Sequence, residues 1–360
     1  HILGVAVDVA WFFQGMEDFK LIAIRNFIIK MINIAFIFIF VKDQGDLWIY
    51  VFGLSFWTLL ANTALWSSLR KYLGKFNFHN IHPFNDLTTI FQLFIPTVAV
   101  QIYGILDRSM IGWLSGVPAE NGYYEQADKI VKMCLMLITA LGTVTIPKIS
   151  REHSRGNIQV VKQLIYRSYR FVWFLGIAMT LGLIGINQKL VPIFFGPGYE
   201  RITLLLPVLS ILFIIMGLNN ATGVQYLVST GKQKIYMYIV IIGGLVNFAL
   251  NAVFIPQYGS VGAALGSVAG EFAILIIEFA YIIKNKSFSV WKIIKSSRNY
   301  IIGGICMNLV LHFTENVFPD SLLGLLVNIG LGGCVYLLML AALKDPFILQ
   351  GIQIILRRLK

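Results

Sequence analysis

Four ionisable residues share one face of a predicted helix in an otherwise apolar part of the chain. In "GYYEQADKIVKM", Glu125, Asp128, Lys129 and Lys132 fall at positions i, i+3, i+4 and i+7. Each acid precedes a base by four residues, the order that favours ion pairs along a helix. At about 1.5 Å per residue, this stripe reaches Lys132 roughly 15 Å below the outer end of the segment. Two interpretations stay open: pairs that neutralise one another in a packed helix, or the charged lining of a water-filled cavity.

The preceding apolar segment carries an acid and a base side by side, Asp107 and Arg108. A helix turns by about 100° per residue, so the two side chains cannot point at the same partner. Gln101 lies seven residues before Arg108 and shares its face, so we expect both to point inward. We expect Asp107 to contact a neighbour such as Lys129. Because arginine stays protonated in any protein environment, Arg108 is a permanent cation at depth.

Two more cations lie within an earlier apolar segment. Arg25 lies about five residues into that segment and Lys30 about ten. We expect Asp8, at a similar depth on the antiparallel neighbour, to neutralise Arg25. Lys30 has no evident acidic partner in the sequence, which leaves three interpretations open: a partner in a missing segment, a side chain that reaches back to the membrane surface, or a site for an anionic ligand.

The remaining reactive residue types do not form a catalytic or metal-binding pattern. Cys134, Cys306 and Cys334 lie in apolar segments without metal spacing, and His79 and His82 lie in a basic loop without acidic or thiol partners. None of the expected outer loops exceeds roughly 16 residues. We therefore expect no enzyme and no cofactor. A coupling ion, H⁺ or Na⁺, is left open.

The composition predicts that membrane helices are the elements that position these residues. The 360 residues are 57% hydrophobic and 13% charged, with a mean hydropathy of +0.76, whereas soluble domains have roughly 25% charged residues. Apolar segments of a length that can cross a bilayer recur throughout. The sequence predicts an all-α polytopic membrane protein with about eleven spans, at 2–14, 20–41, 48–69, 87–115, 122–147, 169–187, 203–229, 235–255, 259–283, 299–316 and 321–343.

Basic residues set the expected orientation of the spans. Of the 29 Lys and Arg residues, 21 fall on one side, 3 on the other and 5 inside spans. Because such residues collect in cytoplasmic loops, the rich side is expected to be cytoplasmic and to hold the C-terminus. This also accounts for the net charge of +12 without a nucleic-acid partner. The tail "PFILQGIQIILRRLK" could be an amphipathic helix on the inner leaflet or a solvated end.

Several stretches resemble bacterial oligosaccharide flippases of the Wzx type. "DVAWFFQGMEDFKLIAIRN" is similar to their fourth and fifth helices, "FIPTVAVQIYGILDRSMIG" and "YYEQADKIVK" to their seventh and eighth, and "NFALNAVFIPQYGSVGAALGSVAGE" to later signatures. These flippases belong to the multidrug/oligosaccharidyl-lipid/polysaccharide (MOP) exporter superfamily. The resemblance implies 14 helices in two lobes, with the first three preceding this chain. The implied divisions are the rest of the N-lobe (1–69), a cytoplasmic linker (70–86), the C-lobe (87–284), and two extra helices with an amphipathic tail (285–360).

The resemblance also implies a function for the charged residues. It implies that undecaprenyl-pyrophosphate-linked repeat units cross the bacterial cytoplasmic membrane by alternating access, for capsule, O-antigen or exopolysaccharide synthesis, with polysaccharide polymerase machinery as a partner. The implied cavity contains the pyrophosphate-binding cations and their polar surroundings: Arg25, Lys30, Gln101, Asp107, Arg108, Tyr123, Tyr124, Glu125, Asp128, Lys129 and Lys132. Tyr103 and Gln126 are further candidates for contact with the glycan. The alternatives are a related drug exporter or lipid II flippase, or a membrane polymerase or ligase.

Overall fold

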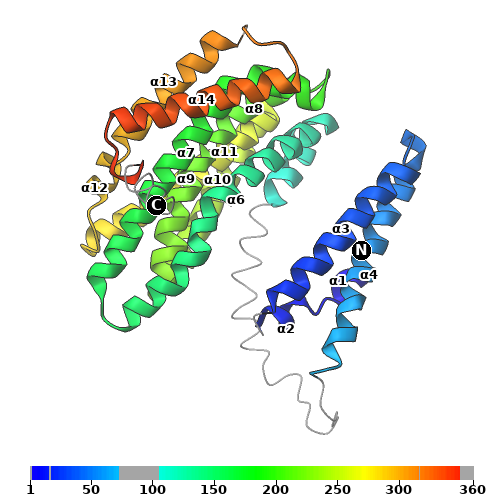
Figure 1. Ribbon diagram of the computed structural model, residues 1–360, viewed down its shortest axis with the longest axis horizontal. Coiled ribbons are helices and arrows are strands. Elements are labelled where there is room, and N and C mark those ends of the chain that lie inside the picture. The colour runs from blue at the N-terminus through cyan, green and yellow to red at the C-terminus, as the bar shows by residue number, and fades with distance from the viewer. Residues whose placement is uncertain (1, 16–17, 73–104, 316, 349–360) are drawn as a thin grey trace, which may run out of the picture. The chain divides into compact units, whose positions relative to one another are not determined.

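The computed structural model describes residues 2–15, 18–72, 105–315 and 317–348 (Figure 1). The chain divides into two compact units, 1–87 and 88–360, which are treated separately below as the first and second units. All regular elements in the described ranges are helices, and eight of these helices are long and apolar enough to cross a membrane. The predicted all-α polytopic fold is confirmed.

In the first unit, the predicted span 2–14 is divided into α1 (Ile2–Ala6) and α2 (Ala10–Gly15). The Asp8 carboxylate accepts the backbone N–H of Ala10 at 2.8 Å, which fixes the start of α2. The break frees carbonyl groups that α4 (Leu47–Leu69) supplies with donors. Asn62 Nδ2 donates to the Gly4 carbonyl at 2.8 Å, and Trp66 Nε1 donates to the Val7 carbonyl at 2.9 Å.

The long helix α3 (Phe19–Phe40) completes the first unit, and a 3₁₀ turn η1 (Gln44–Asp46) joins it to α4. The Asp18 carboxylate accepts the N–H of Leu21 and caps the start of α3. Each of the two long helices has more than 20 residues, enough to cross a hydrocarbon core of about 30 Å.

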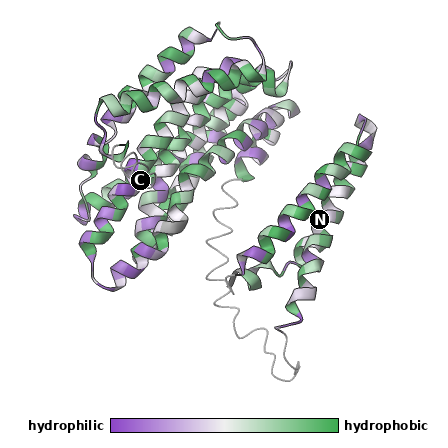
Figure 2. Cartoon of the chain, in the orientation of Figure 1, coloured by the Kyte–Doolittle hydropathy of each residue, from purple (hydrophilic) through white to green (hydrophobic). Residues whose placement is uncertain are grey.

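The second unit contains the remaining helices, and Figure 2 shows that most of their length is hydrophobic. Residues 105–114 form one helix, the described part of the span predicted at 87–115. The others are α6 (Pro118–Ser154), α7 (Ile158–Phe195), α8 (Arg201–Ser210), α9 (Leu212–Asn219), η3 (Asn220–Val228), α10 (Gln233–Tyr258), α11 (Ser260–Lys284), α12 (Val290–Lys295), α13 (Arg298–Thr314) and α14 (Leu322–Ala342).

The stretch between the predicted spans 122–147 and 169–187 is almost entirely helical, so both helices extend beyond the predicted spans. Helix α6 continues through Pro147 to Ser154 and α7 begins at Ile158, so a turn around Gly156 (φ +76°) joins them. With 37 residues, α6 extends for about 55 Å, well beyond a hydrocarbon core of about 30 Å. Apolar periodicity marks only the part of a helix that meets lipid or protein, so the polar extensions were not recognised in the sequence.

The segment from α8 to η3 is helical but irregular, and polar side chains satisfy its freed carbonyls. Pro207 has no N–H for the carbonyl of Thr203, and Asn187 Nδ2 of α7 donates to that carbonyl at 2.6 Å. Where α8 gives way to α9, the Ser210 carbonyl accepts the hydroxyl of Thr180 at 2.9 Å. Helix α7 therefore stabilises the break from the side, as apolar surroundings require.

Helices α10 and α11 approach closely because glycines line their contact. A Cβ added at Gly262 would collide with the backbone of Phe254, and one at Gly266 with Oδ1 of Asn251. Small residues at a spacing of four let two helices approach in this way. The approach places the fully buried Asn251 next to Ser267, whose partner is described below.

Helices α13 and α14 pack together and against α7 on one side of the second unit (Figure 1). Tyr336 donates to the Phe174 carbonyl at 2.8 Å, and Tyr300 donates to the buried Asp345 carboxylate at 3.0 Å. The two predicted extra helices are thus attached through hydrogen-bonded aromatic side chains. Most of the tail predicted to be amphipathic lies outside the described residues.

Candidate functional site

The charged face of α6 forms both ion pairs that its spacing predicts. Lys129 lies 3.1 Å from Glu125, and Lys132 lies 2.7 Å from Asp128. Three of these side chains are about half exposed, at 55% for Lys129, 43% for Glu125 and 59% for Lys132. Asp128 is only 14% exposed because it lies closer to the neighbouring helix. The stripe therefore lies on a surface of the second unit and not within its core.

Arg108 joins this stripe from the helical residues 105–114. Its Nη2 lies 2.9 Å from Asp128 Oδ2, the same oxygen that Lys132 contacts. The expected separation of Arg108 from Asp107 is confirmed, and the structure adds the contact of Arg108 with the α6 stripe. The buried Nε of Arg108 has no hydrogen-bond partner among the described residues, so this guanidinium retains a free donor. Gln101, expected on the same face, lies outside the described residues.

Asp107 corrects the expectation of a contact with Lys129, which pairs with Glu125 instead. The Asp107 carboxylate is 5% exposed and accepts three hydrogen bonds from neutral side chains. The donors are Tyr124 at 3.0 Å, Asn251 Nδ2 at 2.6 Å and Ser267 at 2.7 Å. This acid therefore joins residues 105–114, α6, α10 and α11, which stabilises the second unit from within.

The two tyrosines at 123 and 124 have different surroundings. Tyr124 is 4% exposed and its hydroxyl lies against Asp107 and Ser267, so it belongs to the packed interior and not to an open lining. Tyr123 is partly exposed and packs edge-to-face on Tyr199, with ring centroids 6.0 Å apart. Of the pair, only Tyr123 has a ring accessible to a ligand, and Gln126 is also partly exposed. Tyr103 lies outside the described residues.

The cationic stripe, defined as Arg108, Glu125, Asp128, Lys129 and Lys132, carries three positive and two negative charges. An exposed group of charges of this size cannot face hydrocarbon without a cost of several kcal/mol per charge. The stripe must therefore face water or protein in the membrane. Its excess positive charge and its free guanidinium donor suit an anionic group with several oxygen acceptors.

The first unit has a donor-rich pocket of its own. A hollow of about 410 Å³ is lined by Lys30 and by polar and aromatic residues of α3 and α4, including Asn26, Asn33, Trp57 and Asn62. Lys30 is exposed and forms no ion pair among the described residues. Within the described part of this unit, Trp57 Nε1 and Asn33 Oδ1 are buried without hydrogen-bond partners. This pocket favours the ligand-site interpretation of Lys30.

Arg25 lies beside that pocket, but its partners differ from the expected one. Its guanidinium donates to the Asn62 side chain at 3.1 Å, the Ala61 carbonyl at 3.0 Å and the Asn26 side chain at 2.7 Å. In the described residues Asp8 forms no ion pair with Arg25 and instead caps α2. Arg25 therefore positions two of the asparagines that line the pocket, and the Asp8 carboxylate acts on its charge from beyond ion-pair distance.

Helix α11 carries two buried acids to which the sequence alone assigns no role. Glu271 accepts a hydrogen bond from Asn219 Nδ2 at 2.7 Å. Glu278 is fully buried, and in the described part of the chain neither of its oxygens has a hydrogen-bond partner. The sequence does mark these two residues as unusual, because an acid within an apolar span is rarely incidental. What it lacked was the identity of the neighbours, which come from η3 and α10.

Comparisons with known proteins identify relatives of this chain. The family described as polysaccharide biosynthesis protein matches residues 1–153. A candidate O-antigen transporter of Escherichia coli strain K12 is 26% identical over 289 residues, which are 79% of this chain and 69% of that protein. The lipid II flippase MurJ of Bacillus subtilis strain 168 is 23% identical over 226 residues, 58% of this chain and 41% of that protein.

The fold has a solved counterpart. A structure of the lipid II flippase MurJ in an inward closed conformation matches with a TM-score of 0.67 at 20% identity. The match covers 82% of this chain and 62% of that chain, so this chain spans less than two thirds of that structure. At this identity the likeness establishes the shared helical fold and nothing about the ligand.

Proposed function

Because the chain is a Wzx-type member of the MOP exporter superfamily, we propose that it is a flippase that moves a lipid-linked oligosaccharide across the membrane. It is a multi-pass membrane protein, and its relatives include O-antigen transporters and a lipid II flippase. The finer proposal is that the substrate is an undecaprenyl-pyrophosphate-linked repeat unit, moved from the inner to the outer leaflet of a bacterial cytoplasmic membrane.

The observation that carries this proposal is the exposed cationic stripe within membrane-spanning helices. A pyrophosphate brings several anionic oxygens, and Arg108, Lys129 and Lys132 offer three cations with a small excess over the acids. Arginine can contact phosphate oxygens with two parallel hydrogen bonds, and the Arg108 side chain is 36% exposed. The acids Asp128 and Glu125 hold the cations in place when no substrate is bound.

The pocket around Lys30 is proposed as the contribution of the first unit. Lys30 supplies a cation without a partner among the described residues, and Arg25 orders the asparagines beside it. Amide and hydroxyl groups are suited to sugar hydroxyls, so this pocket can take the glycan or a phosphate. Tyr123 is the aromatic surface proposed for the sugar rings on the second unit.

A lipid II flippase is the second candidate, because the lipid II flippase MurJ of Bacillus subtilis is among the relatives by sequence. Both substrates join an undecaprenyl lipid to a sugar through a pyrophosphate, so the same cations would serve either one. The two candidates differ in the glycan, and cells that depend on one flippase or the other separate them.

Complementation tests the proposal directly. The gene that encodes this chain is introduced into one strain that lacks its O-antigen flippase and into another depleted of its lipid II flippase. We expect restored surface polymer, and loss of the accumulated lipid-linked intermediate, in the first strain only. Growth of the second strain without restored polymer in the first would favour the lipid II substrate. Rescue of neither strain would contradict both candidates.

Substitution of Arg108 tests the stripe. We expect Arg108→Ala to reduce polymer export by about 10- to 100-fold, because a charge-assisted hydrogen bond is worth about 1.5–3 kcal/mol. Asp128 keeps Lys132 as a partner, so the protein should still reach the membrane at its normal level, measured by immunoblot. Arg155→Ala, at the exposed turn after α6, is the matched control and should export normally. Normal export by Arg108→Ala would remove Arg108 from the site.

A further inference from the structure

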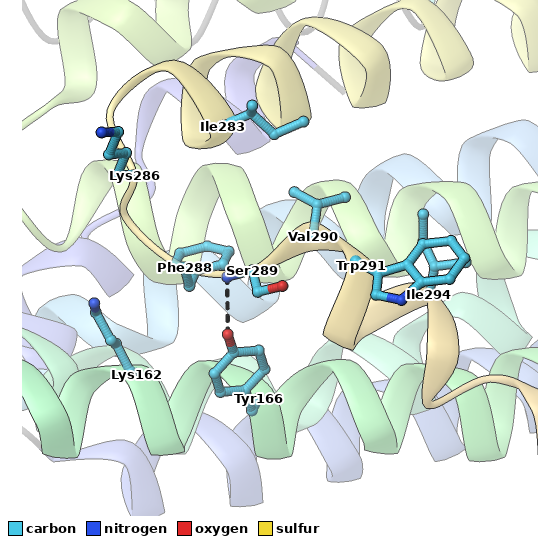
Figure 3. A pocket seen from close by; sticks show the side chains of 9 residues that line it. All are labelled: Lys162, Tyr166, Ile283, Lys286, Phe288, Ser289, Val290, Trp291 and Ile294. Carbon is cyan, nitrogen blue, oxygen red and sulfur yellow. Dashed lines mark hydrogen bonds between the residues drawn. The ribbon is translucent and has the colours of Figure 1, made fainter.

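Two adjoining pockets lie where the start of α7 meets the loop after α11, away from the cationic stripe. The larger has a volume of about 730 Å³ (Figure 3) and the smaller about 360 Å³. They share Lys162, Lys286 and Phe288 as lining residues, so they adjoin and are here called together the double pocket. Volumes of this size are typical of small-molecule sites.

The loop between α11 and α12, which lines the double pocket, is hydrogen-bonded to α7. The backbone N–H of Ser289 donates to the Tyr166 hydroxyl at 2.9 Å, the dashed line in Figure 3. Phe288 is 8% exposed and packs edge-to-face against Tyr166 and Tyr226. Lys286 has a left-handed backbone conformation (φ 50°), uncommon for a residue other than glycine. The lining of the double pocket is therefore preformed.

The double pocket is positively charged. Lys162 and Lys286 line both parts, and Lys232 and His153 line the smaller one. No acidic residue is among the lining residues, and none of the three lysines forms an ion pair in the described ranges. Lys232 Nζ lies 5.1 Å from the centre of the Tyr226 ring, which holds it in place by a cation–π contact. Converging, unneutralised cations in a concave site attract an anion.

The polar and apolar parts of the lining are separated in space. In Figure 3, Lys162 and Lys286 lie at one end of the larger pocket and Trp291 and Ile294 at the other. Trp291 is 72% exposed and Ile283, also in the lining, is 61% exposed. Helix α12 is short and follows the membrane helix α11, so this exposed tryptophan is at the boundary where aromatic residues gather in membrane proteins.

We propose that the double pocket binds an anionic phospholipid of the bilayer, with its phosphate at Lys162, Lys232 and Lys286 and its acyl chain along Trp291, Ile294 and Ile283. A free phosphate would use only the cationic end and would leave the apolar end exposed to water. A phospholipid matches both ends at once, and the end of the helices that carries the lysines is the one that the charge distribution assigns to the inner leaflet. The proposal concerns a different surface from the transport site and stands without the proposed function.

Lipid retention in native mass spectrometry tests the proposal on the full chain released from membranes. Wild-type protein is titrated with phosphatidylglycerol and, separately, with phosphatidylcholine. The test variant is K162Q/K286Q, and the matched control is K284Q/K295Q, which removes two exposed lysines that line neither pocket. A lysine near an anionic lipid contributes about fivefold in affinity, so we expect about a 25-fold loss of phosphatidylglycerol binding in the test variant and little change in the control.

Three outcomes would overturn the proposal. The first is equal binding of phosphatidylglycerol and phosphatidylcholine by the wild type. The second is equal loss in the test and control variants, which would indicate a general charge effect. The third is displacement of phosphatidylglycerol by millimolar inorganic phosphate together with unchanged binding in Trp291→Ala, which would assign the pocket to a soluble anion. We expect Trp291→Ala to weaken phosphatidylglycerol binding and phosphate to compete poorly.

Discussion

Asp107 and Arg108 show how far a sequence can assign individual residues. Helical geometry alone separated their directions, and Arg108 does meet the α6 stripe at Asp128. The partners of Asp107 could not be inferred in the same way, because Asn251 and Ser267 lie 144 and 160 positions further along the chain. Local spacing predicts contacts within a helix or between neighbours, whereas a buried acid takes its donors from the tertiary packing.

Substitution of Asp107 should therefore affect stability. Asp107→Ala removes three buried hydrogen bonds to a carboxylate, each worth about 1.5–3 kcal/mol, although the Ser267 hydroxyl and the Asn251 amide each keep one other acceptor. We expect the apparent unfolding temperature of the solubilised protein to fall by roughly 5 °C or more. Glu125→Ala removes an acid that is 43% exposed and should shift that temperature much less. Similar values for the two variants would contradict the structural role of Asp107.

At the scale of elements, the predicted spans are found as helices wherever the structure describes them, but their ends and irregularities are not predicted. Hydrophobicity located α6 and α7, whereas their polar extensions to Ser154 and from Ile158 resemble loop sequence. A proline such as Pro207 removes one N–H donor from its helix, but the sequence does not show that Asn187 supplies the missing donor. That compensation depends on the alignment of two helices, and periodicity within either helix carries no information about it.

A double-mutant cycle tests this compensation. Asn187→Ala should lower the unfolding free energy by about 1–3 kcal/mol, because the Thr203 carbonyl loses its donor in an apolar environment. In a Pro207→Ala background the helix can supply its own N–H to that carbonyl, so the same substitution should cost less than half as much. Thermal or denaturant unfolding of the four proteins measures the coupling. Equal costs in the two backgrounds would show that Asn187 does not act through Pro207.

At the scale of the whole molecule, composition and charge predict a membrane protein but leave its sites incomplete. Eight helices suited to crossing a bilayer are present in the described chain, and the comparisons support the same architecture. Orientation in the bilayer still rests on the distribution of Lys and Arg, 21 on one side and 3 on the other. The candidate sites could be predicted only in part, because the partners and the exposure of each charged side chain depend on tertiary packing, as the distant donors to Asp107 show.

Cysteine labelling tests the predicted orientation. In a background without Cys134, Cys306 and Cys334, single cysteines replace Arg155 at the α6–α7 turn or Val317 between α13 and α14, both exposed. We expect a membrane-impermeant maleimide to label Val317→Cys in intact cells and Arg155→Cys only after the cells are opened. The reverse pattern would place the lysine-rich loops outside and would also move the double pocket to the outer leaflet.

The sharing of one Asp128 oxygen by Arg108 and Lys132 has a kinetic consequence under the proposed function. An arriving phosphate must displace this carboxylate from its two cations, and the carboxylate remains within reach to return when the lipid moves on. Asp128 thus acts as an intramolecular competitor that keeps residence of the anion short. A site with three unpaired cations would release the lipid more slowly, and slow release would limit the rate of transport.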